Sequence, residues 1–175
     1  KSLGFCEGDQ IPFFLLATPE CIYLLLAIEK SGASILCRDN TLEENIEAVQ
    51  NSGTSAIIVH DYLKQSELEK YLSACPIEKI VFLDPCHSCN RQDMPDYIKN
   101  NLDNNYFFYD EKVPQSIDWD EFLYLGQNYT GTVDAPTDIN RPLFRAYTSG
   151  STGPSKQVIH SAHTMIEIIH QMNFY

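Results

Sequence analysis

The 175-residue chain is short of positive charge: 12 Lys and Arg residues face 24 Asp and Glu residues, which gives a net charge of −12. Nucleic acids and anionic membranes repel such a protein, so we expect neither as a partner. An anionic small ligand would need a local site that works against the overall field. Hydrophobic residues make up 43% of the chain, which predicts a folded protein with a real core.

The chain also lacks an uninterrupted apolar run that could cross a bilayer. Its most apolar stretch, Ile11–Ile28, is broken by Pro12 and by the sequence Thr18-Pro19-Glu20. We interpret this stretch as a buried strand followed by a buried helix, and predict no membrane span. No secretory signal can be recognised, which favours a cytoplasmic location.

The six cysteines form no dense disulfide framework, so we expect them to be reduced. Cys86 and Cys89 have the spacing of half a zinc site, but the sequence has no second Cys-x-x-Cys and no His-x-x-x-His to complete it. His160 and His163 could join them only through a contact that the sequence does not show. We therefore predict no metal site, and interpret residues 86–89 as a polar loop.

Alternating apolar runs and helix signals organise the first half of the chain. The strands predicted from continuous apolar runs are Ile11–Ala17, Ser34–Cys37, Ala56–His60 and Lys79–Leu83. The helices predicted between them are Pro19–Ser31, a helix that reaches Asn51–Gly53 from Thr41, and Gln65–Ala74. This order predicts an α/β fold with a mostly parallel sheet and helices on both faces.

Several helix ends have their own signals. Thr18 is expected to cap the helix that begins at Pro19, and Gly32 to end it in the left-handed conformation. Capping boxes are predicted at Thr41 and, for a later helix, at Asp118. We interpret the acidic residues after Asp118 as a solvated helix start and not as a metal site.

The second half is less regular and divides at a polar segment. We predict an α/β subdomain over 1–129, a linker loop over 130–142, and a hairpin with a following helix over 143–175. The elements predicted here are strands Tyr106–Tyr109, Leu143–Tyr147 and Gln157–Ser161, and helix Ala162–Met172. His60, at the end of a predicted strand, is a weak ligand candidate, because α/β sheets bind ligands where strands end.

The loop Thr148–Lys156 is the most informative segment. Gly150 and Gly153 allow backbone N–H groups to approach an anion, and Lys156 adds a positive charge. The hydroxyl donors are Thr148, Ser149, Ser151 and Thr152. The combination predicts a polyphosphate site, with a flexible Ser/Gly connection as the plain alternative.

Two common nucleotide motifs do not fit. A Walker A loop counted from Gly150 needs Gly at 155 and Ser or Thr at 157, where this chain has Ser155 and Gln157. No G-x-G-x-x-G follows the first strand, which disfavours a Rossmann NAD site.

The sequence Tyr-Thr-Ser-Gly-Ser-Thr-Gly-Pro-Ser-Lys at 147–156 resembles the phosphate-binding loop of the adenylate-forming (AMP-binding) superfamily. That superfamily includes acyl-CoA synthetases, nonribosomal peptide synthetase adenylation domains and luciferases. Its usual pattern has Pro where this chain has Ser155, and Gly where it has Gln157. Further likenesses lie at Leu3–Asp9, Ala27–Ala33, Asn51–Val59 and Trp119–Leu123, so the resemblance covers nearly the whole chain in order.

The resemblance implies the amino-terminal part of a large AMP-binding domain in an ATP-dependent ligase. Such enzymes use ATP and Mg²⁺ to convert a carboxylic acid to an acyl-adenylate, and then pass the acyl group to the thiol of CoA or of a carrier protein. Lys156 is implied as the catalytic residue, and the loop from Thr148 to Gly153 as the cradle for the β- and γ-phosphates.

This sequence contains no Tyr-Gly-x-Thr-Glu motif and no carboxy-terminal domain with a catalytic lysine. We therefore expect a fragment that is inactive alone, that leaves an apolar edge or face exposed, and whose Mg²⁺ is held mostly by residues outside it. The alternative is a non-catalytic nucleotide-binding or regulatory module, which would bury the helix Ala162–Met172. A phosphatase-like or kinase-like protein is disfavoured, because the sequence has no Cys-x5-Arg.

Overall fold

The computed structural model describes residues 3–13, 18–37, 41–60, 64–84, 86–97, 99–100, 116–148 and 156–172. The strands are β1 (Gln10–Pro12), β2 (Ser34–Leu36), β3 (Ala56–His60), β4 (Lys79–Leu83), β5 (Ser116–Ile117), β6 (Pro142–Tyr147) and β7 (Gln157–Ser161). The helices are α1 (Pro19–Ser31), α2 (Leu42–Ser52), α3 (Gln65–Ala74), α5 (Trp119–Gln127) and α6 (Ala162–Met172), with a 3₁₀ turn at Arg91–Asp93.

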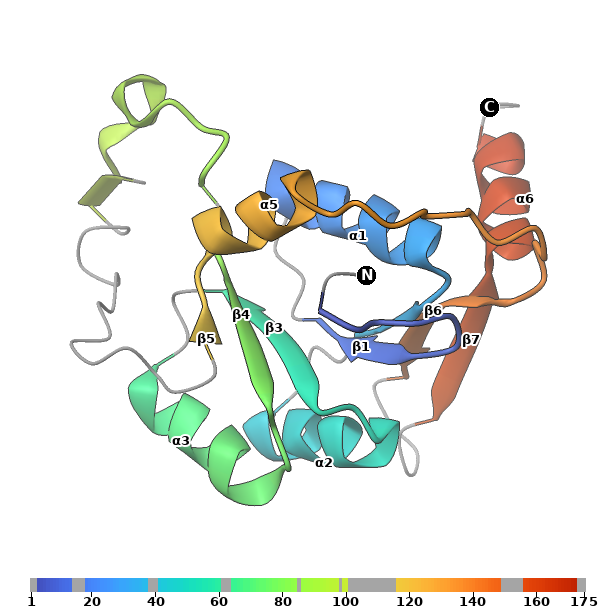
Figure 1. The fold of residues 1–175 in the computed structure, drawn as a ribbon, viewed down its shortest axis with the longest axis horizontal. Coiled ribbons are helices and arrows are strands. Elements are labelled where there is room, and N and C mark those ends of the chain that lie inside the picture. The colour runs from blue at the N-terminus through green and yellow to red at the C-terminus, as the bar shows by residue number, and fades with distance from the viewer. Residues whose placement is uncertain are drawn as a thin grey trace.

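The strands form one continuous sheet. Hydrogen bonds define the orders β1-β2-β6-β7 and β3-β4-β5, and a parallel bridge between Phe13 and Ile58 joins the two groups. The full order is therefore β7-β6-β2-β1-β3-β4-β5 (Figure 1). The described strand pairs are parallel except β6 and β7, which are antiparallel.

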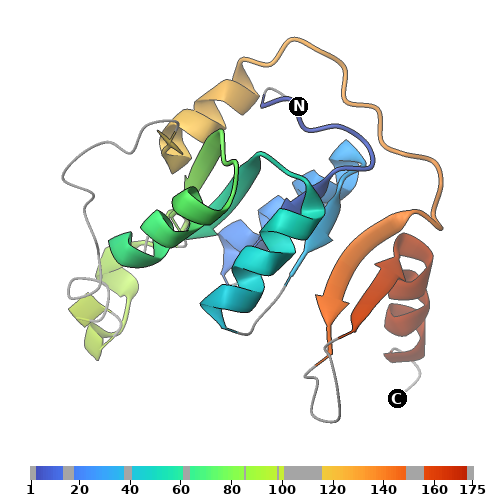
Figure 2. The same cartoon turned by 90° about the horizontal axis from the view of Figure 1, so that it is seen from below.

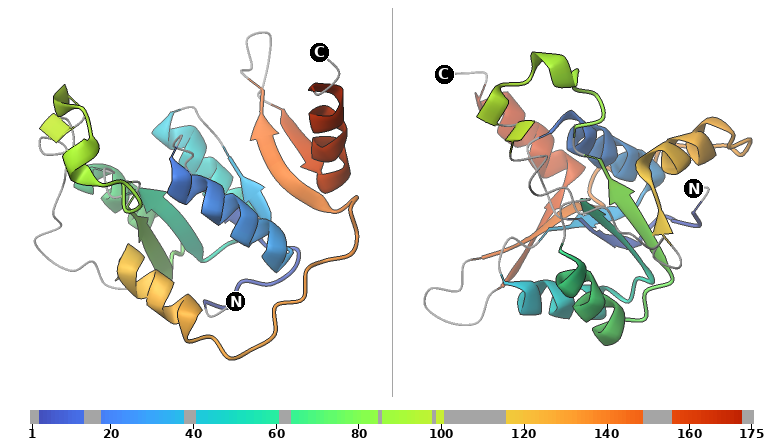
Figure 3. Two further views of the ribbon diagram at one scale, coloured as in Figure 1. Left: turned by 90° about the horizontal axis from the view of Figure 1, so that it is seen from above. Right: turned by 90° about the vertical axis from the view of Figure 1, so that its left-hand side faces the viewer.

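Helices cover both faces of this sheet, which confirms the predicted α/β class. Helices α1 and α5 lie on one face and α2 and α3 on the other (Figure 1). Helix α6 lies on the same side as α1 (Figures 1 and 3). Viewed from the α2 side, no helix among the described residues lies in front of β6 and β7 (Figure 2).

Side chains of the central strands alternate between two cores. Ile58 and Val81 pack with the residues of α1 and α5, whereas Ile57, Val59 and Ile80 pack with those of α2 and α3. All five are at most 2% exposed. Burying one such side chain stabilises a protein by about 1.5–3 kcal/mol, so these strands are held from both sides.

Most of the predicted helix ends are confirmed. The backbone N–H of Glu44 donates to the Thr41 hydroxyl at 3.3 Å and the Thr41 N–H donates to the Glu44 carboxylate at 3.2 Å, which completes the capping box of α2. Asp118 caps α5 by accepting from Glu121 N–H at 2.7 Å. Thr18 stands at the start of α1, but its predicted capping hydrogen bond is absent. Pro19 sets the helical φ at this end without needing a partner for an N–H group.

The strand predictions succeed where the apolar run is continuous. The bounds of β3, β4 and β7 are those predicted, and β1 begins one residue earlier, at Gln10. Residues 14–17 of the first predicted strand and the whole of Tyr106–Tyr109 lie outside the described residues. Strand β5, only two residues long, was not predicted from the sequence.

The predicted exposed apolar surface is present on β7 and α6. Val158 is 39% exposed and Ile159 is 51% exposed. Helix α6 has no buried residue. Its large exposed apolar side chains are Met165, Ile166, Ile168, Ile169 and Met172. An apolar face of this extent is typical of an interaction surface.

The stretch Ile11–Ile28 does not form a long apolar helix. Its helical part belongs to α1, which has 13 residues. Across the described residues, no helix combines the length and apolarity that a membrane span requires.

Gly32 supplies a first test of the fold. It ends α1 at φ +85°, and a Cβ there would lie 3.0 Å from Glu7 Cγ and 3.1 Å from Pro136 Cγ. We expect Gly32→Ala to destabilise the protein by at least about 1–2 kcal/mol in urea unfolding, because the left-handed backbone alone costs that much. Gly126→Ala is the matched control: this helical glycine faces open space, so the substitution should stabilise by about 0.5–1 kcal/mol. Equal changes in the free energy of unfolding for the two variants would contradict the backbone strain that we assign to an alanine at position 32.

Candidate functional site

The parallel pairing gathers the carboxyl ends of the strands at one edge of the sheet. Tyr147 ends β6, which runs parallel to β2, and His60 ends β3, which runs parallel to β4. Ligands of α/β proteins bind beyond this edge. The loop that starts at Thr148 therefore begins where such a fold places a ligand.

The two ends of the predicted phosphate loop are hydrogen-bonded to each other. The Thr148 N–H donates to the Lys156 carbonyl at 2.9 Å, and the Lys156 N–H donates to the Thr148 hydroxyl at 3.0 Å. Both residues are exposed. The structure thus brings Thr148 and Lys156 together at the mouth of the loop. The other predicted site residues, Ser149, Gly150, Ser151, Thr152 and Gly153, lie outside the described residues.

A line of polar side chains crosses the sheet beside this mouth. Gln157 pairs directly with Tyr147 across the hairpin, and its amide Nε2 donates to the Tyr147 hydroxyl at 3.1 Å. Arg145 donates from Nη1 to Gln157 Oε1 at 3.3 Å and from Nε to the Ser34 hydroxyl at 3.1 Å. We call Ser34, Arg145, Tyr147 and Gln157 the polar band.

Sequence reasoning missed the polar band as a unit. Arg145 and Tyr147 stand two residues apart, so they point to the same face of β6, and Phe144 points to the α1 core on the other face. This alternation was a usable signal for that strand. The contact between Arg145 and Ser34 could not be predicted from the sequence, because it joins residues 111 positions apart.

Two further contacts hold the hairpin to the rest of the chain. Arg141 is 8% exposed, and its Nη2 lies 2.8 Å from the Glu29 carboxylate and 2.7 Å from the Glu29 carbonyl. The backbone N–H of His163 donates to the carbonyl of Ile139 at 2.9 Å, and its Nδ1 lies 3.3 Å from the Asn140 side chain. These contacts fix the start of β6 and the start of α6, so His163 has a structural place here.

His60, the weak ligand candidate, ends β3 in a half-buried position. Burial lowers its pKa below 6.5, and the charge of Glu67 opposes this only in part. The imidazole is therefore mainly neutral at pH 7. It lies on β3, separated from β6 by β1 and β2 in the strand order.

The segment with Cys86 and Cys89 forms a tight turn over the start of α1. The Cys86 N–H donates to Asp84 at 2.9 Å, the Cys89 N–H donates to the Cys86 carbonyl at 3.0 Å, and the Ser88 N–H donates to the buried Glu20 carboxylate. All six cysteines are free. Nowhere in the described ranges do three His, Cys, Asp or Glu side chains gather as metal ligands would.

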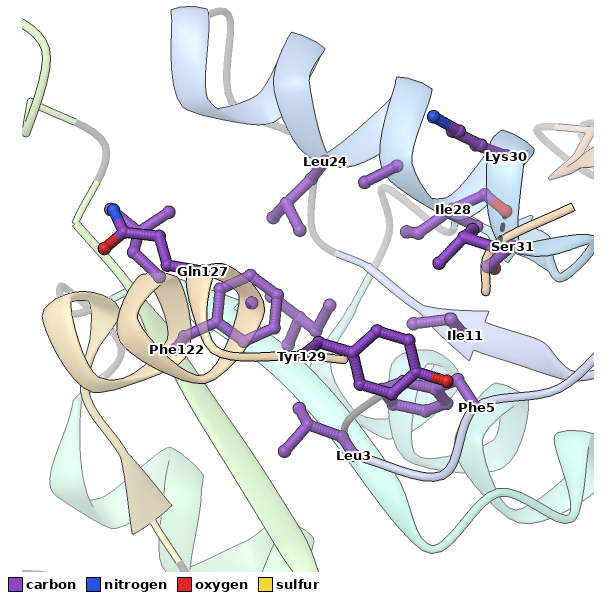
Figure 4. Close-up of a pocket in the computed structure, with 15 residues that line it drawn as sticks. Leu3, Phe5, Ile11, Leu24, Ile28, Lys30, Ser31, Phe122, Gln127 and Tyr129 are labelled. Atoms are coloured by element: carbon purple, nitrogen blue, oxygen red, sulfur yellow. Dashed lines mark hydrogen bonds between the residues drawn. The ribbon is translucent and has the colours of Figure 1, made fainter. Parts of the chain in front are cut away.

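A cavity of about 550 Å³ lies between α1 and α5 (Figure 4). Apolar side chains such as Leu3, Leu24, Ile28 and Phe122 line most of it. It adjoins the carboxyl half of α1, which leads into the start of β2, so it extends toward the edge of the sheet opposite Thr148. We assign it no part in the loop's chemistry.

Comparison with known proteins agrees with this arrangement. The family described as AMP-binding enzyme matches residues 1–175. Acetyl-coenzyme A synthetase 1 of Saccharomyces cerevisiae is 28% identical over 165 residues, which are 91% of this chain and 21% of that protein. The protein of the same name from Kluyveromyces lactis is 26% identical over 171 residues, with the same shares of the two chains.

Solved structures show the same fold. Acetoacetyl-CoA synthetase from Streptomyces lividans matches with a TM-score of 0.68 at 16% identity, over 98% of this chain and 24% of that one. The anthranilate CoA ligase AuaEII, solved with anthranoyl-AMP, matches with a TM-score of 0.65 at 18% identity, over 97% of this chain and 28% of that one.

The chain belongs to the family of AMP-binding enzymes. The resemblance to the adenylate-forming superfamily that the sequence predicted is thereby confirmed. The chain spans about a fifth of the length of the curated relatives named above.

Glu20 supplies a test of the turn over α1. Burial alone would raise the pKa of this carboxyl, but hydrogen bonds from Ser88 and nearby groups outweigh it and lower the pKa below its ordinary 4.5. A lowered pKa means that Glu20 stabilises the fold above about pH 4.5 and loses this effect as the pH falls further. We expect Glu20→Gln to reduce stability at pH 7 and to lose that difference toward pH 3, measured by urea unfolding across this range. Glu78→Gln, at an exposed position, is the control, and a deficit for Glu20→Gln that stays constant with pH would contradict the assignment.

Proposed function

We propose that the protein containing this chain activates a small carboxylic acid with Mg-ATP and passes the acyl group to a thiol. In the first step a carboxylate oxygen bonds to the α-phosphorus of ATP, the bond from that phosphorus to the bridging oxygen breaks, and pyrophosphate leaves. In the second step the thiol of CoA or of a carrier protein displaces AMP. The observation that carries the proposal is the Thr148–Lys156 loop, closed at its base by two hydrogen bonds at the carboxyl edge of the sheet.

The roles of the loop residues follow from their chemistry. Backbone N–H groups around Gly150 and Gly153 would face the β- and γ-phosphates, with hydroxyl donors from Thr148, Ser149, Ser151 and Thr152. Lys156 would offset the negative charge that grows on pyrophosphate as it leaves. Holding the phosphates in place also fixes the α-phosphorus for attack, so the loop acts by position and charge.

Mg²⁺ would enter this site with ATP. Magnesium is commonly held by one or two carboxylates together with the phosphates of the substrate. The described residues offer no cluster of carboxylates at the loop. We propose that its protein ligands lie mostly outside residues 1–175, and expect these residues alone to be inactive.

The net charge of −12 supports a local role for the cations at the loop. A nucleotide triphosphate is repelled by the protein as a whole, so positive charge must be concentrated where the phosphates bind. Lys156 stands at the mouth of the loop and Arg145 lies on the strand that leads to it. The six free cysteines agree with a reducing compartment, and we propose the cytoplasm.

The alternative function is a non-catalytic nucleotide-binding module that keeps the phosphate loop. Such a module would bury its last helix within itself. Within residues 1–175 helix α6 has no buried residue and exposes Met172 to 73%, so these residues alone do not form such a module.

Lys156→Ala tests the proposed function in the natural protein. We expect it to slow carboxylate-dependent ATP–pyrophosphate exchange by at least about tenfold, because a charged hydrogen bond contributes roughly 1.5–3 kcal/mol. Ser151→Ala should slow the exchange less, since it removes a neutral donor. Lys70→Ala, on the exposed surface of α3, is the control and should leave the rate unchanged.

The exchange assay of the unaltered protein also separates the two functions. Exchange that depends on an added carboxylic acid supports the enzyme. Binding of Mg-ATP with no exchange under any of a panel of small carboxylic acids would instead favour the regulatory module.

A further inference from the structure

Gln157 stands where the AMP-binding pattern has glycine, and its side chain is part of the polar band. Its side-chain amide makes one hydrogen bond as a donor and one as an acceptor. Nε2 donates to the Tyr147 hydroxyl at 3.1 Å, and Oε1 accepts from Arg145 Nη1 at 3.3 Å. A glycine could make neither contact. The departure from the pattern therefore adds a side-chain link between β6 and β7.

This link lies at the last strand pair before the loop. Tyr147 and Gln157 are direct partners in the antiparallel register, and the next residues are Thr148 and Lys156. Among the described residues, β7 has a hydrogen-bonded neighbour only on the β6 side, so its position next to the loop depends on its pairing with β6. A side-chain link at this pair supports that pairing.

The link continues into the body of the sheet. Arg145 Nε donates to the Ser34 hydroxyl at 3.1 Å, and Ser34 is the first residue of β2 and 2% exposed. The Ser34 hydroxyl in turn donates to the Asp9 carbonyl at 3.2 Å, directly before β1. The hairpin is thereby tied through Arg145 to a buried residue of the parallel sheet.

We propose that Gln157 is a positioning residue that fixes the base of the phosphate loop through Tyr147 and Arg145. The inference deepens the proposed function and rests on it for the identity of the ligand. Residues that are already held in place lose less conformational freedom when a ligand binds. Gln157 holds the first residue pair outside the loop, and with it Thr148 and Lys156, in place before ATP binds.

The neutral amide suits this task beside a phosphate site. A glutamate at 157 would accept from both Arg145 and Tyr147 and hold the strands as well, but it would bring a negative charge to the loop. A methionine would keep the size of the side chain and lose both hydrogen bonds. Gln157→Met and Gln157→Glu therefore separate the link from the charge.

The first readout is amide hydrogen exchange of the peptide that covers 147–157 in the natural protein without nucleotide. We expect Gln157→Met to speed exchange at Thr148 and Lys156 by about tenfold, the effect of losing one to two ordinary hydrogen bonds at this pair. Gln157→Glu should exchange as slowly as the unaltered protein. Gln65→Met, an exposed glutamine on α3, is the matched control and should change nothing at the loop.

The second readout is the steady-state kinetics of carboxylate-dependent ATP–pyrophosphate exchange. We expect Gln157→Met to raise KM for ATP several-fold and to leave kcat within about twofold, since it affects the order of the loop before binding. Gln157→Glu should also raise KM, although its loop stays protected from hydrogen exchange. A merely structural role would instead lower the amount of active protein, and hence kcat, with KM unchanged.

The outcomes for the two proposals are distinct. Unaltered hydrogen exchange in Gln157→Met, or a fall in kcat alone, would overturn the role of Gln157 even in an active enzyme. An unaltered protein that shows no carboxylate-dependent exchange would overturn the proposed function, and hydrogen exchange at the loop base would still decide whether Gln157 holds the hairpin.

Discussion

The burial of β3 and β4 on both faces is the constraint from which the rest of the structure follows. Ile57 and Ile58 are neighbours in sequence, point to opposite cores, and are at most 2% exposed. A strand that is apolar on both faces needs helices on both, and the chain provides them as crossovers between parallel strands. Parallel strands in turn bring their carboxyl ends to one edge. The loop that begins at Thr148, for which we propose phosphate binding, starts at that edge because β6 joins the sheet parallel to β2.

The local elements could be predicted from the sequence because their signals are local. The capping box at Thr41 and the left-handed Gly32 each depend on residues within one turn of the chain. Strand β5 gave no signal, since Ser116 and Ile117 are too few to show a period. The strand order was beyond the sequence as well, because the bridge from Phe13 to Ile58 joins residues that no local pattern relates.

The candidate site divides in the same way. Residue types in the Thr148–Lys156 loop predict an anion site, since glycine, hydroxyl and lysine are what phosphate chemistry requires. The polar band depends instead on register: Gln157 reaches Tyr147 only because β6 and β7 pair as they do, and Arg145 reaches Ser34 only because β6 lies beside β2. From the sequence alone Gln157 was a mismatch to the family pattern. In the structure it is a side chain with two partners.

The charge of the protein explains why an amide fits this position. With a net charge of −12, each cation near the loop matters for an anionic ligand, and a carboxylate partner for Arg145 would cancel the charge that it fixes in place. The same reasoning applies to Ser34, the other partner of Arg145, which is also neutral. Both contacts orient the guanidinium without pairing it to a carboxylate, so under the proposed function its charge would remain available to the phosphates. By contrast, the carboxylate-paired Arg141 lies at the opposite end of β6, where it holds α1 and no phosphate is expected. Arg141, directly before β6, thus stabilises the fold through Glu29, whereas Arg145, on the strand itself, is the arginine for which we propose a role at the site.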